Sequence, residues 1–346
     1  MLEKTAELIL GEYQPDTLAI SAKNGQVATG TEEGVKLYAV GETITAISDS
    51  DSDLPEDSSA AATEDKAKTQ IICFSPGGKV LAAAESEGGT VGVYDFPSLK
   101  RFATLDTGLG PVEGKMGVPK GVRGLALSSA GASQMLAVNG RNGSCTIWQV
   151  GFAEKTPTRI TQLEVPAEGK ASFKCCDYIE AQGALITGVN VASGAKGRDV
   201  KALLVRWSMD TWKVEAKAWV LKSGLTAMTV CKTTNMVGIG GSDGTVGVFD
   251  ATSLARVFTV VAHGMAVTGA VLVPARAEGQ APKGQESKKG EVWRAHPPLL
   301  VSVALNNVVL ATPVVPMTMG EKAKEQMALI IAVLLVLIAM AAVASR

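Results

Sequence analysis

The stretch Asn235–Asp250 decides the fold class, and it reads Asn-Met-Val-Gly-Ile-Gly-Gly-Ser-Asp-Gly-Thr-Val-Gly-Val-Phe-Asp. Two short runs of small and β-branched residues flank the turn residues Ser242-Asp243-Gly244, a pattern typical of paired strands and not of a helix. Gly244 can supply the positive φ that a tight hairpin needs. We therefore predict a β-hairpin whose second strand carries the aromatic residue Phe249.

The same arrangement recurs along the chain. Clear copies are Lys79–Asp95 and Met135–Trp148, and weaker copies are Gln26–Val40 and Ala184–Trp207. The aromatic residues that mark the copies are spaced by 56, 54, 59 and 42 residues, and they are Tyr38, Tyr94, Trp148, Trp207 and Phe249. Four-stranded propeller blades recur at about 40 to 45 residues, and surface insertions lengthen the spacing. The sequence therefore predicts an all-β propeller of about six blades, the first and last of them incomplete.

The last predicted blade contains three strands, which are Val267–Val273, Leu299–Leu305 and Val308–Val314. A propeller closes when its last sheet is joined by a strand from the other end of the chain, because an open ring leaves unpaired edges. The segment Thr5–Leu10 is one candidate for the missing fourth strand. The alternative is a blade missing at the N-terminus.

Two insertions interrupt the strands. Ser48–Asp65 holds seven acidic residues and no basic one, which favours a solvated loop over a partner-binding acidic segment. Arg276–Arg294 is rich in Gly, Gln and Lys and predicts a loop within the last blade. We therefore expect a propeller over residues 1–316, with an acidic disordered loop at 48–68 and a mobile insertion at 275–296, followed by a linker at 317–326.

The segment Met327–Ala344 contains eighteen consecutive uncharged residues, ten of them Leu, Ile or Val. Such a run predicts a transmembrane helix, and those ten residues favour insertion by roughly 3 to 6 kcal/mol. As a helix it is about 27 Å long, close to the thickness of the endoplasmic reticulum bilayer. A buried core helix is the alternative, but such helices keep a polar stripe. Because the N-terminus shows no signal peptide, we expect a tail-anchored protein whose propeller faces the cytosol.

Composition argues against several function classes. The formal net charge is −1, which offers no general attraction to nucleic acid. The five cysteines include no C-x-x-C pair and predict a reduced protein without a disulfide framework or a zinc ribbon. The two histidines, His263 and His296, cannot form a His-rich metal site. With no phosphate-binding loop, nucleophile elbow or paired carboxylates, covalent catalysis is not expected, and no cofactor is identified.

Two groups of single residues have structural interpretations. Cys175 and Cys176 are adjacent in a predicted strand, so their side chains should lie on opposite faces of the sheet, one packed in the core and the other exposed. The cluster Trp207, Trp212 and Trp219 is expected in the core or on the rim, with a binding platform as the alternative.

The stretch Gly240–Thr268 combines the hairpin with Ala262-His263-Gly264 and Val267-Thr268. It resembles the junction of the last two blades in the WD-repeat exchange factors of the endoplasmic reticulum, the prolactin regulatory element-binding protein or "Sec-twelve" family. Cys73–Lys79 with Val93–Leu99 is similar to that family's second repeat. The resemblance covers about residues 17–344 and implies a WD-repeat-like propeller, with seven blades expected for the family.

The resemblance implies roles for the junction residues. Asp243, Gly244, His263 and Thr268 are the residues of the structural motif, and His263 is expected to bond a Ser or Thr hydroxyl and hold a loop. The implied activity is exchange of GDP for GTP on the Sar-type small GTPase, which starts COPII coat assembly. The implied partners are therefore this GTPase, COPII coat components and, through Met327–Ala344, the lipid bilayer.

One part of the family pattern has no match in this chain. The exchange activity of the family rests on a Gly-rich loop in the first blade that holds a potassium ion. Gly240-Gly241-Ser242 is a turn in a late blade, and Gly25 and Gly30 do not form such a run. Either the N-terminus is truncated, or the protein is a paralogue without exchange activity that resembles the plant phosphate transporter traffic facilitator. The hypotheses are an exchange factor, a non-catalytic adaptor for exit from the endoplasmic reticulum, and a generic WD scaffold on an organelle membrane.

Overall fold

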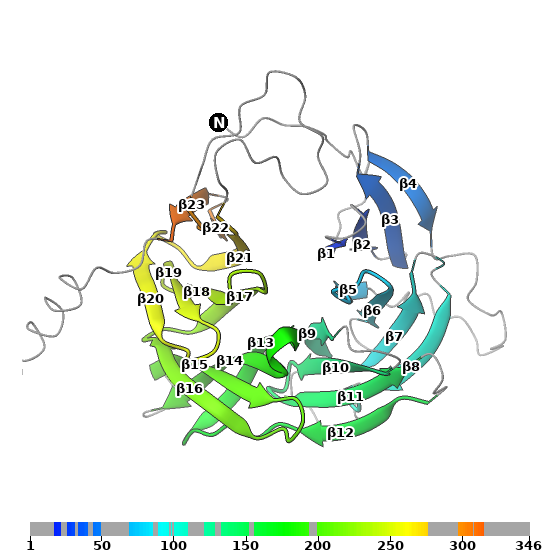
Figure 1. Ribbon diagram of the computed structural model, residues 1–346, viewed down its shortest axis with the longest axis horizontal. Helices are drawn as coiled ribbons and strands as arrows, with labels where there is room; N and C mark the ends of the chain where they lie inside the picture. The colour runs from blue at the N-terminus through cyan, green and yellow to red at the C-terminus, as the bar shows by residue number, and fades with distance from the viewer. Residues whose placement is uncertain are drawn as a thin grey trace, which may run out of the picture.

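The computed structural model is all-β, with a single short 3-10 helix at Glu180–Gln182 in the part of the chain that it describes. The described residues are 17–21, 26–31, 34–40, 44–49, 69–85, 89–96, 98, 100–109, 121–128, 133–151, 156–193, 199–275, 297–306 and 308–314. Their strands form six antiparallel sheets arranged about a common centre (Figure 1).

The first three sheets have four strands each. The first sheet consists of β1 (Thr17–Ser21), β2 (Gln26–Thr31), β3 (Gly34–Val40) and β4 (Ile44–Asp49). The second consists of β5 (Thr69–Phe74), β6 (Val80–Glu85), β7 (Thr90–Asp95) and β8 (Arg101–Asp106). The third consists of β9 (Val122–Leu127), β10 (Ser133–Gly140), β11 (Cys145–Gly151) and β12 (Thr158–Gln162).

The fourth and fifth sheets also have four strands, and the sixth has three. The fourth consists of β13 (Lys170–Ile179), β14 (Ala184–Ser193), β15 (Asp199–Ser208) and β16 (Val214–Leu221). The fifth consists of β17 (Leu225–Cys231), β18 (Met236–Gly241), β19 (Thr245–Asp250) and β20 (Arg256–Val261). The sixth consists of β21 (Val267–Val273), β22 (Leu299–Ala304) and β23 (Val309–Pro313).

Within every sheet the strands pair in chain order, so each sheet is a meander that starts near the centre and ends at the perimeter (Figure 1). Each first strand packs against the first strand of the next sheet, which places the six sheets side by side as the blades of a propeller. The prediction of about six blades is confirmed, as is the three-stranded last blade. The prediction of an incomplete first blade is wrong.

The predicted acidic loop begins inside the first sheet. Its first two residues, Ser48 and Asp49, end β4, where they pair with Leu37 and Lys36 of β3, so the prediction of a disordered loop is wrong for them. The pairing of Ile44–Ala46 with β3 continues into Ser48 and Asp49. Polar residues are tolerated here because β4 is the outer edge strand of its sheet. The remainder of the predicted acidic loop, 50–68, lies outside the described residues.

The hairpin pattern of the sequence is reproduced in the sheets. The five marker aromatics all lie on the third strand of a sheet, namely Tyr38, Tyr94, Trp148, Trp207 and Phe249. In the fifth sheet, β18 pairs with β19 through the turn that contains Gly244, whose φ is +83°. The prediction that Gly244 supplies a positive φ is therefore confirmed.

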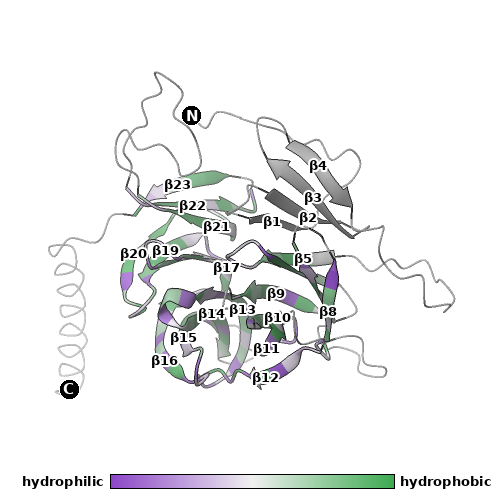
Figure 2. Ribbon diagram, turned by 45° about the vertical axis from the view of Figure 1, so that its right-hand side comes forward, coloured by the Kyte–Doolittle hydropathy of each residue, from purple (hydrophilic) through white to green (hydrophobic). Residues whose placement is uncertain are grey.

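From the second sheet to the sixth, apolar side chains fill the space between neighbouring sheets, and Figure 2 shows the hydrophobic residues along these strands. Ile147 and Phe173 belong to the core between the third and fourth sheets, and Ile186 and Val237 to the core between the fourth and fifth. The core between the fifth and sixth sheets contains Val248, Leu272 and Leu300. These five sheets thus share apolar cores with their neighbours, as the blades of a propeller do.

Several predictions concern residues outside the described part. These are the closing strand Thr5–Leu10, the insertion at 276–296 with His296, the linker at 317–326, and the membrane anchor from Met327 to Ala344. Among the described residues, no helix has the length and apolarity needed to cross a bilayer. The anchor therefore stays a prediction.

Candidate functional site

The motif residues meet where the fifth sheet passes to the sixth. His263 lies in the connecting loop, with its Nε2 2.8 Å from Ser302 Oγ of β22, and both side chains are buried. The backbone N–H groups of Ala262 and His263 both donate to the carbonyl oxygen of Gly244 at 3.1 Å. Because the hairpin turn and the loop share these bonds, the position of β21 depends on the conformation of Gly244.

The other two motif residues have smaller parts in this junction. The carboxylate of Asp243 accepts a bond from Thr245 N at 3.1 Å and so shapes the hairpin. Thr268 is exposed, and its hydroxyl donates to the carbonyl of Val303 at 3.3 Å. These residues support the turn and the edge of the junction, and their contacts are structural.

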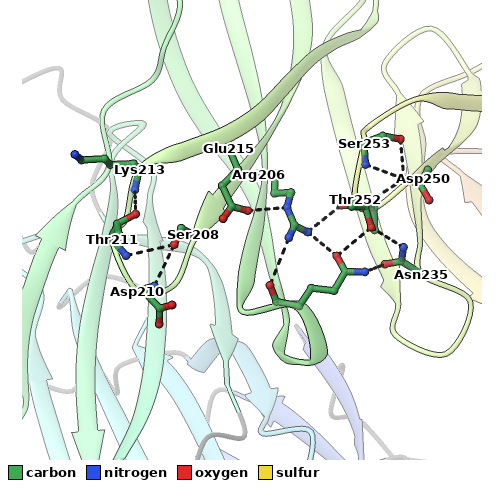
Figure 3. A network of polar contacts seen from close by, with 12 residues as sticks. Arg206, Ser208, Asp210, Thr211, Lys213, Glu215, Asn235, Asp250, Thr252 and Ser253 are labelled. Carbon is green, nitrogen blue, oxygen red and sulfur yellow. Dashed lines mark hydrogen bonds and ion pairs between the residues drawn. The ribbon is translucent and has the colours of Figure 1, made fainter.

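A polar network centred on Arg206 joins the fourth and fifth sheets (Figure 3). Arg206 Nε donates to Glu215 at 2.8 Å, and Nη1 donates to the side-chain oxygen of Gln182 at 2.6 Å. Nη1 also donates to the carbonyl of Ala251 at 3.3 Å, in the fifth sheet. Arg206 is 8% exposed, so its charge is removed from water and depends on these acceptors.

The network continues across the junction through side chains of the fifth sheet. Gln182 donates through Nε2 to Asn235, whose amide donates to the Thr252 hydroxyl at 2.9 Å. Asp250 then accepts bonds from the backbone N–H groups of Thr252 and Ser253. Figure 3 shows these groups on adjacent hairpin turns. The arrangement fixes the angle between two blades and suits a rigid scaffold.

Sequence reasoning did not identify the Arg206 network. The available signal was a single charged residue within the apolar run Leu203-Leu204-Val205-Arg206-Trp207. A lone Arg in such a run needs acceptors, and Glu215 lies only nine residues away on the next strand. Gln182 and Ala251, however, are 24 and 45 residues away, so local sequence patterns do not identify these two partners.

A second cluster of charge lies at the end of β13. The carboxylate of Asp177 is 4.0 Å from Lys232 Nζ and accepts a bond from Tyr178 N at 2.8 Å, and Glu180 is 3.9 Å from the same Lys232. Burial raises the pKa of Asp177 to about 6, Lys232 and the Tyr178 N–H oppose this, and the charge of Glu180 adds to it. The Asp177 side chain is still 35% exposed, so water screens part of this shift in its pKa.

We expect Asp177→Asn to flatten the pH dependence of stability. Because the folded pKa of about 6 exceeds the unfolded value of about 3.9, protonated Asp177 stabilises the fold below about pH 4, and this contribution is lost as the pH rises through 6. After allowance for partial solvent exposure, the variant should gain about 1 kcal/mol relative to wild type between pH 4 and pH 7.5. Urea unfolding at both pH values measures this. An equal difference at the two pH values would contradict it.

The three tryptophans of the predicted cluster separate in the structure. Trp207 is buried, Trp212 packs at the edge of the same core, and Trp219 of β16 is 57% exposed. Trp219 borders a cleft of about 520 Å³ between the fourth sheet and the preceding loop, with Lys201, Lys222 and Glu168 beside it. Among the described large hydrophobic residues that are exposed, Trp219 is the one aromatic. Exposed Trp residues are frequent anchors of protein interfaces.

The cysteines pack in or against the cores between the sheets. Cys176 packs against the core shared with the third sheet and Cys175 against the core shared with the fifth, which confirms their predicted opposite faces. The prediction that one of them is exposed is wrong, because a neighbouring sheet covers each face of the fourth sheet.

All five cysteines are free, and burial raises the pKa of Cys73 to about 12 and of Cys175 to about 11. The thiols of Cys73 and Cys175 are therefore protonated at neutral pH. At Cys231 burial acts in the same direction, but hydrogen bonds with Thr233 and Thr234 lower its pKa. Within the described ranges, no three His, Cys, Asp or Glu residues are grouped as metal ligands.

Comparison with known proteins supports the architecture. No family model matches the chain, and no curated protein matches it. Among solved structures, the chain is similar to the computationally designed Ika8 protein, with 14% identity and a TM-score of 0.50. The match covers 89% of this chain and 73% of the designed one. At this identity the likeness concerns the fold alone.

Proposed function

We propose that this protein is a guanine-nucleotide exchange factor for the Sar-type small GTPase, acting at the endoplasmic reticulum membrane. The observation that carries the proposal is the stretch Gly240–Thr268, whose residue order resembles the blade junction of that exchange-factor family. In the structure this stretch is folded as a junction between two blades, held by His263 and Ser302. The proposal includes the C-terminal helix Met327–Ala344 as the membrane anchor.

An exchange factor of this kind makes no covalent bond. It binds the nucleotide-free GTPase more tightly than the loaded form, so it lowers the barrier to nucleotide release. This requires a surface whose shape does not relax when the partner changes conformation. The Arg206 network and the Asn190 side chain, which bonds Leu225 N at 2.7 Å and Leu225 O at 3.1 Å across the fourth and fifth sheets, give such rigidity. The anchor raises the effective concentration of the factor where the GTPase acts.

The test is nucleotide release on liposomes. The full chain is reconstituted in vesicles, and release of a fluorescent GDP analogue from the Sar-type GTPase is followed, with a Ras-type GTPase as specificity control. We expect release from the Sar-type GTPase to accelerate at least about tenfold, which corresponds to about 1.4 kcal/mol. Equal release rates with and without the protein would overturn the proposal.

Trp219 is the first residue to substitute in a test of the GTPase-binding surface, because it is an exposed aromatic beside a cleft. We expect Trp219→Ala to reduce the acceleration about tenfold, the usual effect of removing a central aromatic contact. Val214→Ala is the matched control, because Val214 lies on the same strand and is 37% exposed but is smaller and not beside the cleft. Equal effects of the two substitutions would show that the partner does not use this surface.

A second candidate function is a non-catalytic adaptor for exit from the endoplasmic reticulum. The absence of the Gly-rich first-blade run from this sequence favours it. For an adaptor, the same assay should give no acceleration, while the reconstituted protein still retains COPII coat components or cargo on the vesicles.

A further inference from the structure

One face of the sixth sheet is apolar and is not covered by the fifth sheet. Side chains alternate between the two faces, and the face toward the fifth sheet carries the buried Leu272, Leu300 and Ser302. The pairing of Val271 with Val301, and of Val301 with Ala311, places those three residues on the other face. We call this other face the open face; by the same pairing it consists of Gly269, Val271, Val273, Leu299, Val301, Val303, Val309, Ala311 and Pro313.

None of the nine residues of the open face has a charged or hydrogen-bonding side chain. Val271 is 51% exposed and Val309 is 54% exposed, so the surface is apolar from the inner strand to the outer one. In Figure 1 the blades form an arc, with the first sheet at one end and the sixth sheet at the other. The open face is the side of the sixth sheet that is turned away from the fifth sheet, so it lies at the end of this arc. A contiguous apolar sheet face in a globular protein is normally covered by another layer.

We infer that residues 327–344 form a helix that docks on the open face when no bilayer is present. The segment is aliphatic and uncharged, so its chemistry matches that of the open face. An eighteen-residue helix is about 27 Å long and about 10 Å wide. Strands of five to seven residues are about 17 to 24 Å long and about 4.8 Å apart, so one helix covers most of a three-stranded face.

The connection allows this docking. Val314 directly follows β23, and the twelve residues 315–326 separate it from Met327. An extended chain of twelve residues spans up to about 40 Å, which is longer than the strands of the sheet. Residues 327–344 can therefore fold back onto the open face of the sheet that ends with β23.

Other segments outside the described residues fit the open face less well. The stretch 50–68 is acidic, and 276–296 contains many charged residues, so burying either against aliphatic side chains is unfavourable. Thr5–Leu10 could pair with the edge of β23, but a paired strand extends the sheet in its own plane and leaves Val271 and Val301 uncovered. The aliphatic segment 327–344 is the occupant that covers the face itself.

Docking and membrane insertion then compete for the same aliphatic residues. In water the segment is shielded by the open face, and a bilayer draws it away because lipid surrounds all sides of the helix while the sheet covers only one. Release of the segment into a bilayer rests on the proposed membrane anchor. Docking of the segment in water does not depend on that proposal, and the experiment measures docking and release separately.

The experiment uses the full chain made by cell-free synthesis without lipid. The pair Val309→Cys and Leu335→Cys is treated with a short bismaleimide, and the intramolecular product is identified by mass spectrometry. The pair Val260→Cys and Leu335→Cys is the matched control, because Val260 is 43% exposed but lies on β20 of the fifth sheet. We expect the first pair to give at least about five times more intramolecular product than the control.

Phosphatidylcholine vesicles are then added, and flotation measures membrane binding independently. Loss of the product together with flotation of the protein supports both steps. If the intramolecular cross-link persists after vesicles are added and the protein does not float, the result supports docking and counts against the membrane anchor. No product above the control, a product only between two chains, or a product of Val309→Cys with Leu8→Cys in place of Leu335→Cys would overturn the docking.

Discussion

Gly244→Ala is expected to lower the free energy of unfolding by more than about 4 kcal/mol. A Cβ atom at this position would lie 1.9 Å from the carbonyl oxygen of His263 and 3.0 Å from that of Met265. Both contacts are with backbone, which no side-chain rotation relieves. The φ of +83° adds strain for any residue with a Cβ. Because Gly244 O also accepts the two bonds from the loop, the substitution should displace the sixth sheet from the fifth.

The control for this prediction is Gly108→Ala. Gly108 also has a positive φ, of +67°, but an added Cβ would meet nothing within 4 Å. Its substitution should cost only the backbone strain, about 1 kcal/mol. Thermal and urea unfolding of the two variants separate the contributions of contact and of conformation. Equal losses in the two variants would show that the Gly244 contact does not control the junction.

Arg206→Met is expected to lower the free energy of unfolding by about 3 kcal/mol. Methionine fills much of the same space but donates no hydrogen bond, so the carbonyl of Ala251 loses the Arg206 donor and Gln182 Oε1 keeps only the longer bond from the Thr252 hydroxyl, at 3.3 Å. Glu215 also loses its partner, although its side chain is 42% exposed and water can replace part of that interaction. The loss should be greatest at the junction of the fourth and fifth sheets.

Arg159→Met is the matched control for Arg206→Met. Arg159 is exposed on β12, and its one described bond is to Gln162 at 2.6 Å. Exposed pairs contribute little, so this variant should change the free energy of unfolding by less than about 0.5 kcal/mol. Hydrogen exchange should locate the effect of Arg206→Met in β15 and in the turn at Ala251. If amide protection from exchange is unchanged in these two places, the Arg206 network does not hold the fourth and fifth sheets together.

The rigidity of the Arg206 junction also bears on the proposed exchange activity. If the scaffold must keep its shape while the GTPase changes conformation, a loosened junction should bind the partner but release nucleotide more slowly. Binding and release measured on the same variant would distinguish this from a simple loss of folded protein.

The sequence by itself determined the all-β class, the number of sheets and the three strands of the last one, because these features depend on contacts between neighbours in the chain. Hairpin turns such as Ser242-Asp243-Gly244 and a marker aromatic on the third strand of each of the first five sheets are local signals. The same local signals misassigned Ser48 and Asp49, whose acidic neighbours suggested a loop although β3 pairs with them.

Only the tertiary structure decided which polar groups meet and which surfaces remain uncovered. His263 and Ser302 are 39 residues apart, and Arg206 reaches Ala251 across 45 residues, so no local pattern relates them. Trp207 and Trp219 lie on adjacent strands, β15 and β16, but one is buried between sheets and the other is exposed on the outer strand. The apolarity of Val271 and Val309 was visible in the sequence, but their exposure follows from the stacking of blades, because a sheet face is covered only where another blade lies beside it.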